Sequence, residues 1–297
     1  MKFTKKSLVA MLTMFTLLVT LFTFSTPTEV SAKTKTKTYK LTMYVGEQYQ
    51  ISPFLCTFKK AKSSKKKVCT AKKKGSYVII TAKKAGKSKV TIKSNKGNFV
   101  YKVTVKKVPF QVATYPMEDG VLVAVKNTSK TYFSSVDIQL TFCDANGVPL
   151  NQGATYVYNL GGKQTAYTQK FYSTYGSTVN LGKTKARVLK WSRSDDVKIK
   201  NFANKVNVNL IKTPATSAYS TDKLKFNCSM NYTGTGSILV NEDIFCYGAG
   251  GKLLKVINAS ATLSSTKNIY TDDVGYSLPE GCVSYKVASK RIYERRY

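Results

Sequence analysis

The sequence of 297 residues contains no histidine. Histidine is the commonest general base and metal ligand near neutral pH, so its absence excludes a Ser-His-Asp or Cys-His active site and argues against a zinc site. No two cysteines have the C-x-x-C spacing of a metal-binding motif. We therefore expect no catalytic residue, no metal and no cofactor, and we interpret the protein as a non-enzyme.

Acidic residues and arginine are also scarce. The chain has 48 Lys and Arg, of which five are Arg, against 15 Asp and Glu, which gives a net charge of +33. Lysine is a hydrated point charge, whereas arginine makes bidentate contacts with phosphate and carboxylate. This composition favours diffuse electrostatic adhesion over a sharply defined phosphate pocket.

The positive charge is concentrated in one segment. Residues 33–107 hold 22 Lys and one acid, Glu47, a net of +21, whereas residues 108–297 carry 23 cations and 13 acids, a net of +10. Charge that only keeps an exported protein soluble explains a surplus of a few units, and lysine on outward strand positions also blocks edge-to-edge pairing. The surplus beyond those needs indicates an anionic partner.

Only one long hydrophobic run is present, at residues 7–24, and it follows three lysines within the first six residues. With Val30-Ser31-Ala32 as a cleavage site, residues 1–32 have the three parts of a secretion signal. A run of 18 residues is just long enough to span a bilayer, so an uncleaved anchor is the alternative. We expect a secreted, extracellular protein associated with the cell envelope, with no stable transmembrane anchor once the signal is cleaved and no intracellular nucleic-acid partner.

Strand patterns dominate after residue 32. Apolar and polar residues alternate in 41–45 and 99–105, and the pattern breaks at glycines, as expected of half-buried strands joined by turns. The predicted turns lie at Gly46, Gly75, Gly86 and Gly97. We interpret Lys33–Lys37 as a flexible lead and the chain from Lys40 onward as a folded, all-β sandwich.

Four stretches of this segment resemble the group 2 bacterial immunoglobulin-like domain over residues 38–107. They are Val45-Gly46-Glu47, Ser63–Val68, Ala82–Ile92 with its Ala85-Gly86 turn, and Tyr101–Val105. The sequence departs from the family in lacking the tryptophan before the Ser-Ser pair and in having Cys69 at a small apolar position. The resemblance implies a small β-sandwich that acts as a stalk, spacer or adhesive module on a bacterial surface, with no catalytic residues.

The remainder of the chain contains two similar stretches about a hundred residues apart, Thr141–Leu150 and Ile244–Leu254. A period of that length indicates two related domains, and Asn146-Gly147 predicts a hairpin in the first of them. The stretch from Phe142 to Gly147 resembles the FxLYD-type β-sandwich of exported bacterial proteins. We expect a signal peptide at 1–32, a Lys-rich immunoglobulin-like domain at 33–107, and β-sandwich repeats at 108–212 and 213–297, joined near Thr213–Ser217.

The six cysteines all lie in the exported part, where disulfides form. Cys143 and Cys246 occupy matching places after Phe in the two repeats, and we interpret both as buried free thiols. Two candidate bridges then remain, Cys56–Cys69 and Cys228–Cys282, although spacing alone does not determine connectivity.

Acidic and aromatic residues supply two further candidate sites. Adjacent acids could run glycoside hydrolysis or bind Ca²⁺, but neighbours on a strand point to opposite faces, so we interpret them as local salt bridges and turn caps. A strip of tyrosines with one tryptophan could stack against sugars, or could simply fill the sandwich cores. The acid pairs are Glu118-Asp119, Asp195-Asp196, Glu242-Asp243 and Asp272-Asp273, and the strip is Tyr156, Tyr158, Tyr167, Tyr172, Tyr175 and Trp191.

Together these observations predict adhesion to an anionic cell-wall polymer or glycan through the cationic immunoglobulin-like domain. The alternatives are a carbohydrate-binding module that uses the Tyr/Trp face of the C-terminal domains, binding to extracellular DNA, and a hydrolase of unfamiliar type. The predicted anion-binding residues are Lys65, Lys66, Lys67, Lys72, Lys73, Lys74, Lys83, Lys84 and Lys87.

Overall fold

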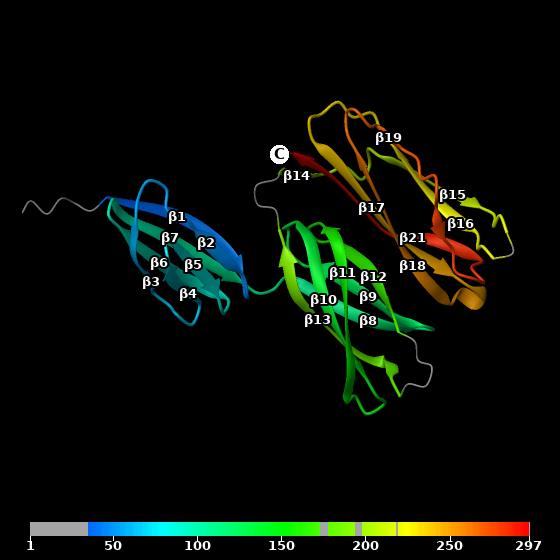
Figure 1. The fold of residues 1–297 in the computed structure, drawn as a ribbon, viewed down its shortest axis with the longest axis horizontal. Helices are drawn as coiled ribbons and strands as arrows, with labels where there is room; N and C mark the ends of the chain where they lie inside the picture. Colours follow the sequence, from blue (N-terminus) through cyan, green and yellow to red (C-terminus); the bar gives the residue numbers. More distant parts are fainter. Residues whose placement is uncertain (1–34, 173–177, 194–197, 218, 297) are drawn as a thin grey trace, which may run out of the picture. The chain divides into compact units, whose positions relative to one another are not determined.

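The computed structural model describes residues 35–172, 178–193, 198–217 and 219–296, and these residues are nearly all β-strand (Figure 1). The one helical element within them is the short 3₁₀ turn η1 (Ala249–Gly251). The predicted all-β sandwich fold is therefore confirmed. No helix in these ranges is long and apolar enough to cross a membrane, and the predicted signal at 1–32 lies outside the described residues.

The chain divides into two compact units, Met1–Val108 and Pro109–Tyr297. The first unit is a two-sheet sandwich with strand orders β1-β7-β6-β3 and β2-β5-β4. Strand β1 runs parallel to β7, and the other pairs are antiparallel. Its strands are β1 (Thr36–Tyr44), β2 (Gln48–Ile51), β3 (Phe58–Ser63), β4 (Cys69–Lys74), β5 (Tyr77–Ala82), β6 (Gly86–Ser94) and β7 (Gly97–Lys106).

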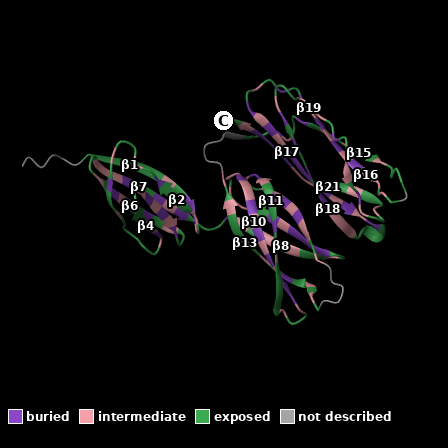
Figure 2. Cartoon of the chain, in the orientation of Figure 1, coloured by how far each residue is buried: buried purple, intermediate pink, exposed green. Residues whose placement is uncertain are grey.

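The alternating pattern of the sequence explains this sandwich. Val90, Ile92, Val103 and Val105 are almost fully buried, whereas the lysines that flank each pair, Lys89, Lys93, Lys102 and Lys106, face solvent (Figure 2). The four predicted turn glycines all have positive φ. One correction concerns the start: β1 begins at Thr36, inside the segment that we interpreted as a flexible lead, because its backbone pairs with β7 from Asn98 onward.

The second unit contains two further sandwiches. The first has the sheets β11-β10-β13 and β12-β9-β8, and the second has β14-β21-β17-β18 and β15-β16-β19 with β20 beside β16. The strands are β8 (Phe110–Met117), β9 (Gly120–Asn127), β10 (Phe133–Cys143), β11 (Pro149–Leu160), β12 (Thr165–Phe171), β13 (Asn180–Ser192), β14 (Lys198–Asn201), β15 (Asn207–Thr213), β16 (Lys223–Ser229), β17 (Ser237–Tyr247), β18 (Leu253–Leu263), β19 (Ile269–Tyr270), β20 (Tyr276–Ser277) and β21 (Ser284–Arg296).

The internal repeat that the sequence indicates is visible in the strand order. Strand β10 lies between β11 and β13, and β17 lies between β18 and β21 in the same way. Each central strand enters a hairpin, but the two hairpins turn differently. Asp144 accepts hydrogen bonds from the backbone of Asn146 and Val148, both at 2.9 Å. The second hairpin lacks this Asp and turns through Gly250 and Gly251, both with positive φ.

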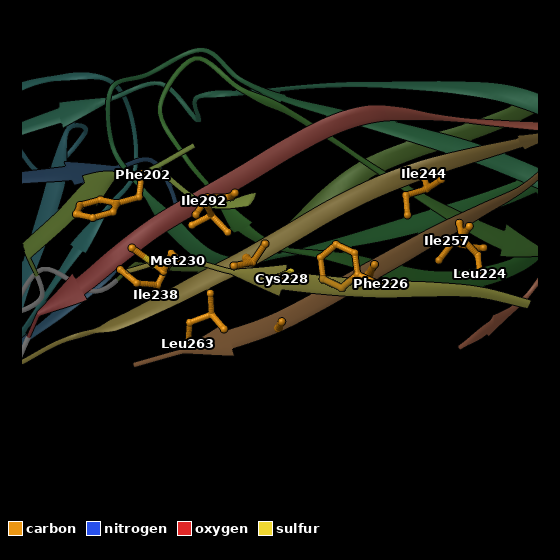
Figure 3. Close-up of a cluster of buried hydrophobic side chains, with 14 of the residues drawn as sticks. Phe202, Leu224, Phe226, Cys228, Met230, Ile238, Ile244, Ile257, Leu263 and Ile292 are labelled. Atoms are coloured by element: carbon orange, nitrogen blue, oxygen red, sulfur yellow. The ribbon is translucent and has the colours of Figure 1, made fainter. Parts of the chain in front are cut away.

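Strand pairing groups residues 198–213 with the last sandwich. Strand β14 pairs with β21, and β15 pairs with β16, so this sandwich begins at Lys198 or earlier, whereas the sequence suggested a join near 213–217. Its core is a cluster of apolar side chains contributed by β16, β17, β18 and β21 (Figure 3). Phe226, Ile238 and Ile244 are fully buried in this cluster.

Candidate functional site

The first sandwich contains a groove where the inner face of one sheet extends past the other. Pairing of β1 with β7 continues down to Thr36 and Asn98, whereas β2 in the facing sheet ends at Ile51. The loop after Ile51 borders the uncovered part, and the resulting groove has a volume of about 670 Å³. This volume falls within the range of about 300–1,000 Å³ typical of small-ligand sites.

Aromatic rings form the floor of the groove. The ring of Tyr39 lies 5.1 Å from that of Tyr101 and 6.5 Å from that of Phe99, in both cases with only 21° between the planes. Beneath them, the buried ring of Phe58 packs edge-on against Phe99 at 5.8 Å. Burial, with the neighbouring Tyr39 and Tyr49, raises the pKa of Tyr101 to about 12. The Tyr101 hydroxyl therefore stays protonated at neutral pH and is able to donate a hydrogen bond.

Three lysines, Lys35, Lys37 and Lys96, line the same groove, and none of its fourteen lining residues is acidic. Lys35 and Lys37 alternate with threonine on β1, a period that places them on the same face as Tyr39. The groove is thus apolar along its floor and cationic at its border. We did not predict these residues from the sequence, although the Lys-Thr alternation that leads into Tyr39 is a strand signal.

The loop bordering the groove is held in place and exposes apolar side chains. Its end is fastened to the β6–β7 turn by two hydrogen bonds, from Thr57 N to Asn95 Oδ1 at 2.8 Å and from Asn95 N to Thr57 O at 3.1 Å. At its tip Phe54 is 85 % exposed and Leu55 is 73 % exposed. Leu55 has a φ of 52°, a strained conformation for a side chain of this size.

The nine predicted anion-binding lysines are all exposed, but the fold divides them into two groups. Backbone hydrogen bonds from Lys83 and Lys84 to Val68 O place the β5–β6 turn beside Lys65–Lys67. Lys72–Lys74 instead run along β4 towards the opposite end, since Lys73 pairs with Val78, which also pairs with Ile51 at the groove. The predicted residues are therefore a surface distribution and not a single pocket.

The second unit has a separate, polar cleft where its two sandwiches meet. The cleft has a volume of about 270 Å³ and is lined by tyrosine, Asn, Ser and an ion pair, Asp243 with Arg291. Tyr156 and Tyr158 stand exposed beside one another on β11, with ring centroids 5.3 Å apart. Part of the predicted Tyr/Trp strip thus does converge on a cavity.

Tyr167 also lines this cleft, where it packs against Phe245 at 4.9 Å. Two further members of the strip lie elsewhere, and Tyr172 packs against Phe142 at 4.3 Å. Trp191 lies edge-on to Phe110 at 5.8 Å. Tyr175 lies outside the described residues. The five described aromatic residues of the strip therefore do not form one stacking face.

Asp243 is the centre of the contact between these two sandwiches. Its carboxylate is fully buried, forms a bidentate ion pair with Arg291 and accepts hydrogen bonds from Tyr167 N at 2.7 Å and from Asn258 Nδ2 at 2.8 Å. Our interpretation of Glu242-Asp243 as a local ion pair or cap is wrong for Asp243, because its partner is 48 residues away.

Neighbouring residues extend this contact along β12. Gln169 Oε1 accepts a hydrogen bond from Val256 N, Asn258 Nδ2 donates to Tyr167 O, and Ser289 Oγ donates to Thr165 O, each at 2.7 Å. Lys252 forms an ion pair with Glu118 at 2.8 Å. The two sandwiches are therefore joined by many charged and neutral hydrogen bonds, and most polar groups of the cleft are already occupied.

Among the other described acids, Asp272 has an expected role, whereas Glu118 pairs with the distant Lys252 and Glu242 is poorly paired. Asp272 caps a turn, since its carboxylate accepts a hydrogen bond from Gly275 N at 2.8 Å, as expected. Glu242 is buried, and its nearest cation, Lys290, is 3.9 Å away. Burial raises the pKa of Glu242, with Lys290 opposing the shift and Asp243 adding to it. Asp195-Asp196 lies outside the described residues.

All six cysteines are free thiols, so neither candidate bridge is present. Cys69 lies beside Ser63 with its Sγ 3.6 Å from Ser63 Oγ, whereas Cys56 precedes Phe58 at the other end of β3. That strand is about 16 Å long at 3.3 Å per residue, and a disulfide requires Cα atoms within about 7 Å. Cys143 and Cys246 are buried and free, as predicted.

The second candidate bridge fails because Cys282 has a different neighbour. Cys228 pairs with Tyr270 on β19. Cys282 follows the turn at Pro279, and the next residue, Val283, donates its N–H to Tyr247 O at 2.8 Å. This places the Cys282 thiol near that of Cys246, and the Cys282 Sγ donates a hydrogen bond to Ser284 O at 3.4 Å. Burial, together with Cys282, raises the pKa of Cys246 to about 12.

The strand order places the chain among multidomain β-sandwich proteins. No family model matches the chain, and no curated protein matches it. Among solved structures, it is similar to native alpha-2-macroglobulin from Escherichia coli spanning domains MG0-NIE-MG1, with 8 % identity over 85 % of this chain and 95 % of that chain. The TM-score is 0.19, so this likeness carries no argument about function.

Proposed function

We propose that this chain is an exported, non-enzymatic protein of the bacterial cell envelope that attaches to an anionic wall polymer or glycan through its first sandwich. The observation that carries the proposal is the charge of that sandwich, with 22 lysines against one carboxylate in residues 33–107. The resemblance to the group 2 bacterial immunoglobulin-like domain and the predicted signal support the same role.

The fold makes this charge available to a polymer. The nine predicted lysines are exposed at both ends of the sandwich, and the groove adds Lys35, Lys37 and Lys96 at its border. A carboxylate in this segment, Glu47, accepts a hydrogen bond from Tyr44 N at 2.8 Å within the turn. A long anion therefore meets many cations without a matching set of competing acids, which favours multivalent attachment.

Binding of residues 33–297 to immobilised anionic wall polymer across a salt series tests the proposal. We expect retention to fall steeply as the salt rises from about 0.05 to 0.5 M, because screening shortens the reach of each charge to a few ångströms. Replacing Lys65, Lys66, Lys67, Lys83 and Lys84 with Gln weakens retention, whereas replacing the exposed Lys183 and Lys185 on β13 has little effect. Retention unchanged at molar salt would contradict the proposal.

The polar cleft of the second unit supports a second candidate, binding of a neutral sugar. Its favourable feature is the exposed pair Tyr156 and Tyr158 beside Asn241 and Ser260. Against it, the Asp243 carboxylate is already occupied by Arg291, Tyr167 N and Asn258. Retention that is insensitive to salt and is lost on Tyr156→Ala in the same assay would favour this candidate over the first.

A further inference from the structure

The groove of the first sandwich differs from the rest of the cationic surface because it combines charge with aromatic rings. Tyr39 stacks on Tyr101 at 5.1 Å and lies nearly parallel to Phe99 at 6.5 Å, and its side chain is 41 % exposed. A flexible chain of phosphates needs only cations, and it gains nothing from such rings. A sugar ring, in contrast, has an apolar C–H face that packs on aromatic rings and hydroxyls that pair with their polar tips.

The charges of the groove lie at its border and leave the floor apolar. Lys35, Lys37 and Lys96 line the groove together with Asn98 and Ser52, and no carboxylate belongs to the lining set. A ligand that fits must therefore carry a negative charge that reaches the lysines and an apolar face that contacts the aromatic rings. Lysine, with three freely rotating donors, suits a carboxylate or a phosphate equally well.

The walls of the groove are preformed. Lys35 O accepts a hydrogen bond from Asn98 N at 2.9 Å, and this close approach requires a glycine at position 97, where a Cβ would lie 2.2 Å from Lys35 O. On the other side, the loop end is fastened through Thr57 and Asn95. Strain of the kind seen at Leu55 is often concentrated at ligand-binding segments. A rigid site loses little conformational entropy on binding.

We propose that this groove seats one pyranose ring bearing a carboxylate or phosphate, with the ring packed against the exposed Tyr39 and the anionic group held by Lys37 and Lys96. The inference rests on the proposed function and narrows it, since the remaining surface lysines attract the polymer and the groove selects a charged sugar within it. The lysines of the groove match the anionic group of such a sugar, and the aromatic rings match its apolar face, which is why we infer this occupant.

The test measures binding of residues 33–297 to tetragalacturonate, whose rings carry carboxylates, and to glucose 1-phosphate, which distinguishes the two anionic groups. A neutral galactose tetramer and polyglycerol phosphate serve as comparison ligands, the first without charge and the second without rings. Titration calorimetry at fixed, low salt gives each dissociation constant. We expect a charged sugar to bind more tightly than either comparison ligand.

Tyr39→Ala is the decisive variant, because Tyr39 is 41 % exposed and its removal leaves the core intact. We expect it to weaken binding of the charged sugar about 3- to 10-fold, the loss typical of one stacking contact, and to leave polyglycerol phosphate binding unchanged. Tyr115→Ala, at an exposed tyrosine of the second unit, is the matched control. Lys37→Gln should weaken the binding of all three anionic ligands. Thermal unfolding of each variant verifies that the fold is intact.

The outcomes separate this inference from the proposed function. Equal binding of tetragalacturonate by the wild type and Tyr39→Ala would overturn the groove as a sugar site while leaving electrostatic attachment in place. Absence of binding to every anionic ligand would overturn both. Binding to phosphatidylglycerol vesicles that is lost in Phe54→Ser and displaces the sugar would show that the exposed loop meets a lipid surface, and would also overturn the inference.

Discussion

Glu242 and Asp243 are adjacent on β17, yet they have opposite electrostatic surroundings. Asp243 is satisfied by Arg291, Tyr167 and Asn258. Glu242 is nearly as buried, and its Oε2 atom accepts no hydrogen bond from the described residues. Because successive strand residues face opposite sides of a sheet, Asp243 points to the neighbouring sandwich and Glu242 faces its own core. The two neighbouring carboxylates therefore contribute differently to the stability of the folded protein.

We expect Glu242→Gln to raise the free energy of unfolding at pH 7 by about 1 kcal/mol, since it removes a buried and poorly paired charge. Burial raises the folded-state pKa of Glu242 above its ordinary value of 4.5. The folded protein then binds more protons than the unfolded chain between these two values, so stability falls as pH rises through them. The gain from Gln should therefore be present at neutral pH and vanish below about pH 4.5. Urea unfolding of both proteins at several pH values measures it.

Asp243→Asn is the matched control and should have the opposite sign. It leaves Arg291 buried without its anion, a change that typically costs about 3 kcal/mol or more. If Glu242→Gln instead destabilised the protein as strongly as Asp243→Asn does, the idea that the poorly paired charge of Glu242 lowers the free energy of unfolding would be wrong. The acid pairs were visible in the sequence, but strand pairing with distant residues, which decides their roles, was not.

At the scale of elements, the turn from Pro279 to Cys282 brings the thiol of Cys282 to the end of β17. We expect oxidised glutathione to convert Cys246 and Cys282 to a disulfide: the S–S bond of glutathione breaks, the protein S–S bond forms, and the two thiol hydrogens pass to two molecules of reduced glutathione. The closed loop should stabilise the protein by about 2–4 kcal/mol. Peptide mapping without reduction identifies the pair, and urea unfolding measures the gain.

Cys246→Ser should abolish this cross-link, whereas Cys228→Ser should leave it unchanged. A bridge from Cys282 to Cys228 would contradict the observed placement, because Cys228 lies on β16 and pairs there with Tyr270 of β19. Cys246 is buried and its pKa is high, so we expect the more exposed Cys282 to react first.

The strands and turns were largely predictable, because alternation and glycine positions depend on local chemistry. Val90, Ile92, Val103 and Val105 are buried as their pattern indicated. The groove was not predictable, since it arises where two sheets differ in extent and only the three-dimensional pairing reveals that difference. The segment containing Lys35 and Lys37 was misinterpreted for a related reason. A polar edge strand shows no alternation of apolar and polar residues, and only its pairing with a neighbouring strand reveals it.

On the scale of the whole molecule, composition predicted the uneven distribution of charge correctly but not its arrangement. The nine predicted lysines are exposed, yet they lie at two ends of one sandwich, and a further three border the groove. A count of charged residues does not show where those residues lie on the folded surface. The contact between the last two sandwiches was likewise hidden, because Asp243 and Arg291 become partners only when β17 and β21 pair.

The parallel pairing of β1 with β7 has a mechanical consequence. Nine residue pairs, from Thr36–Asn98 to Tyr44–Lys106, join the strand that enters the first sandwich to the strand that leaves it. Because the two strands run in the same direction, pulling the ends of the sandwich apart slides one strand along the other and loads these hydrogen bonds together. We expect single-molecule stretching to show a high rupture force for this sandwich, reduced by Thr38→Pro, which removes a strand N–H. A protein tethered at one end to a surface would in this way resist tension through its first domain.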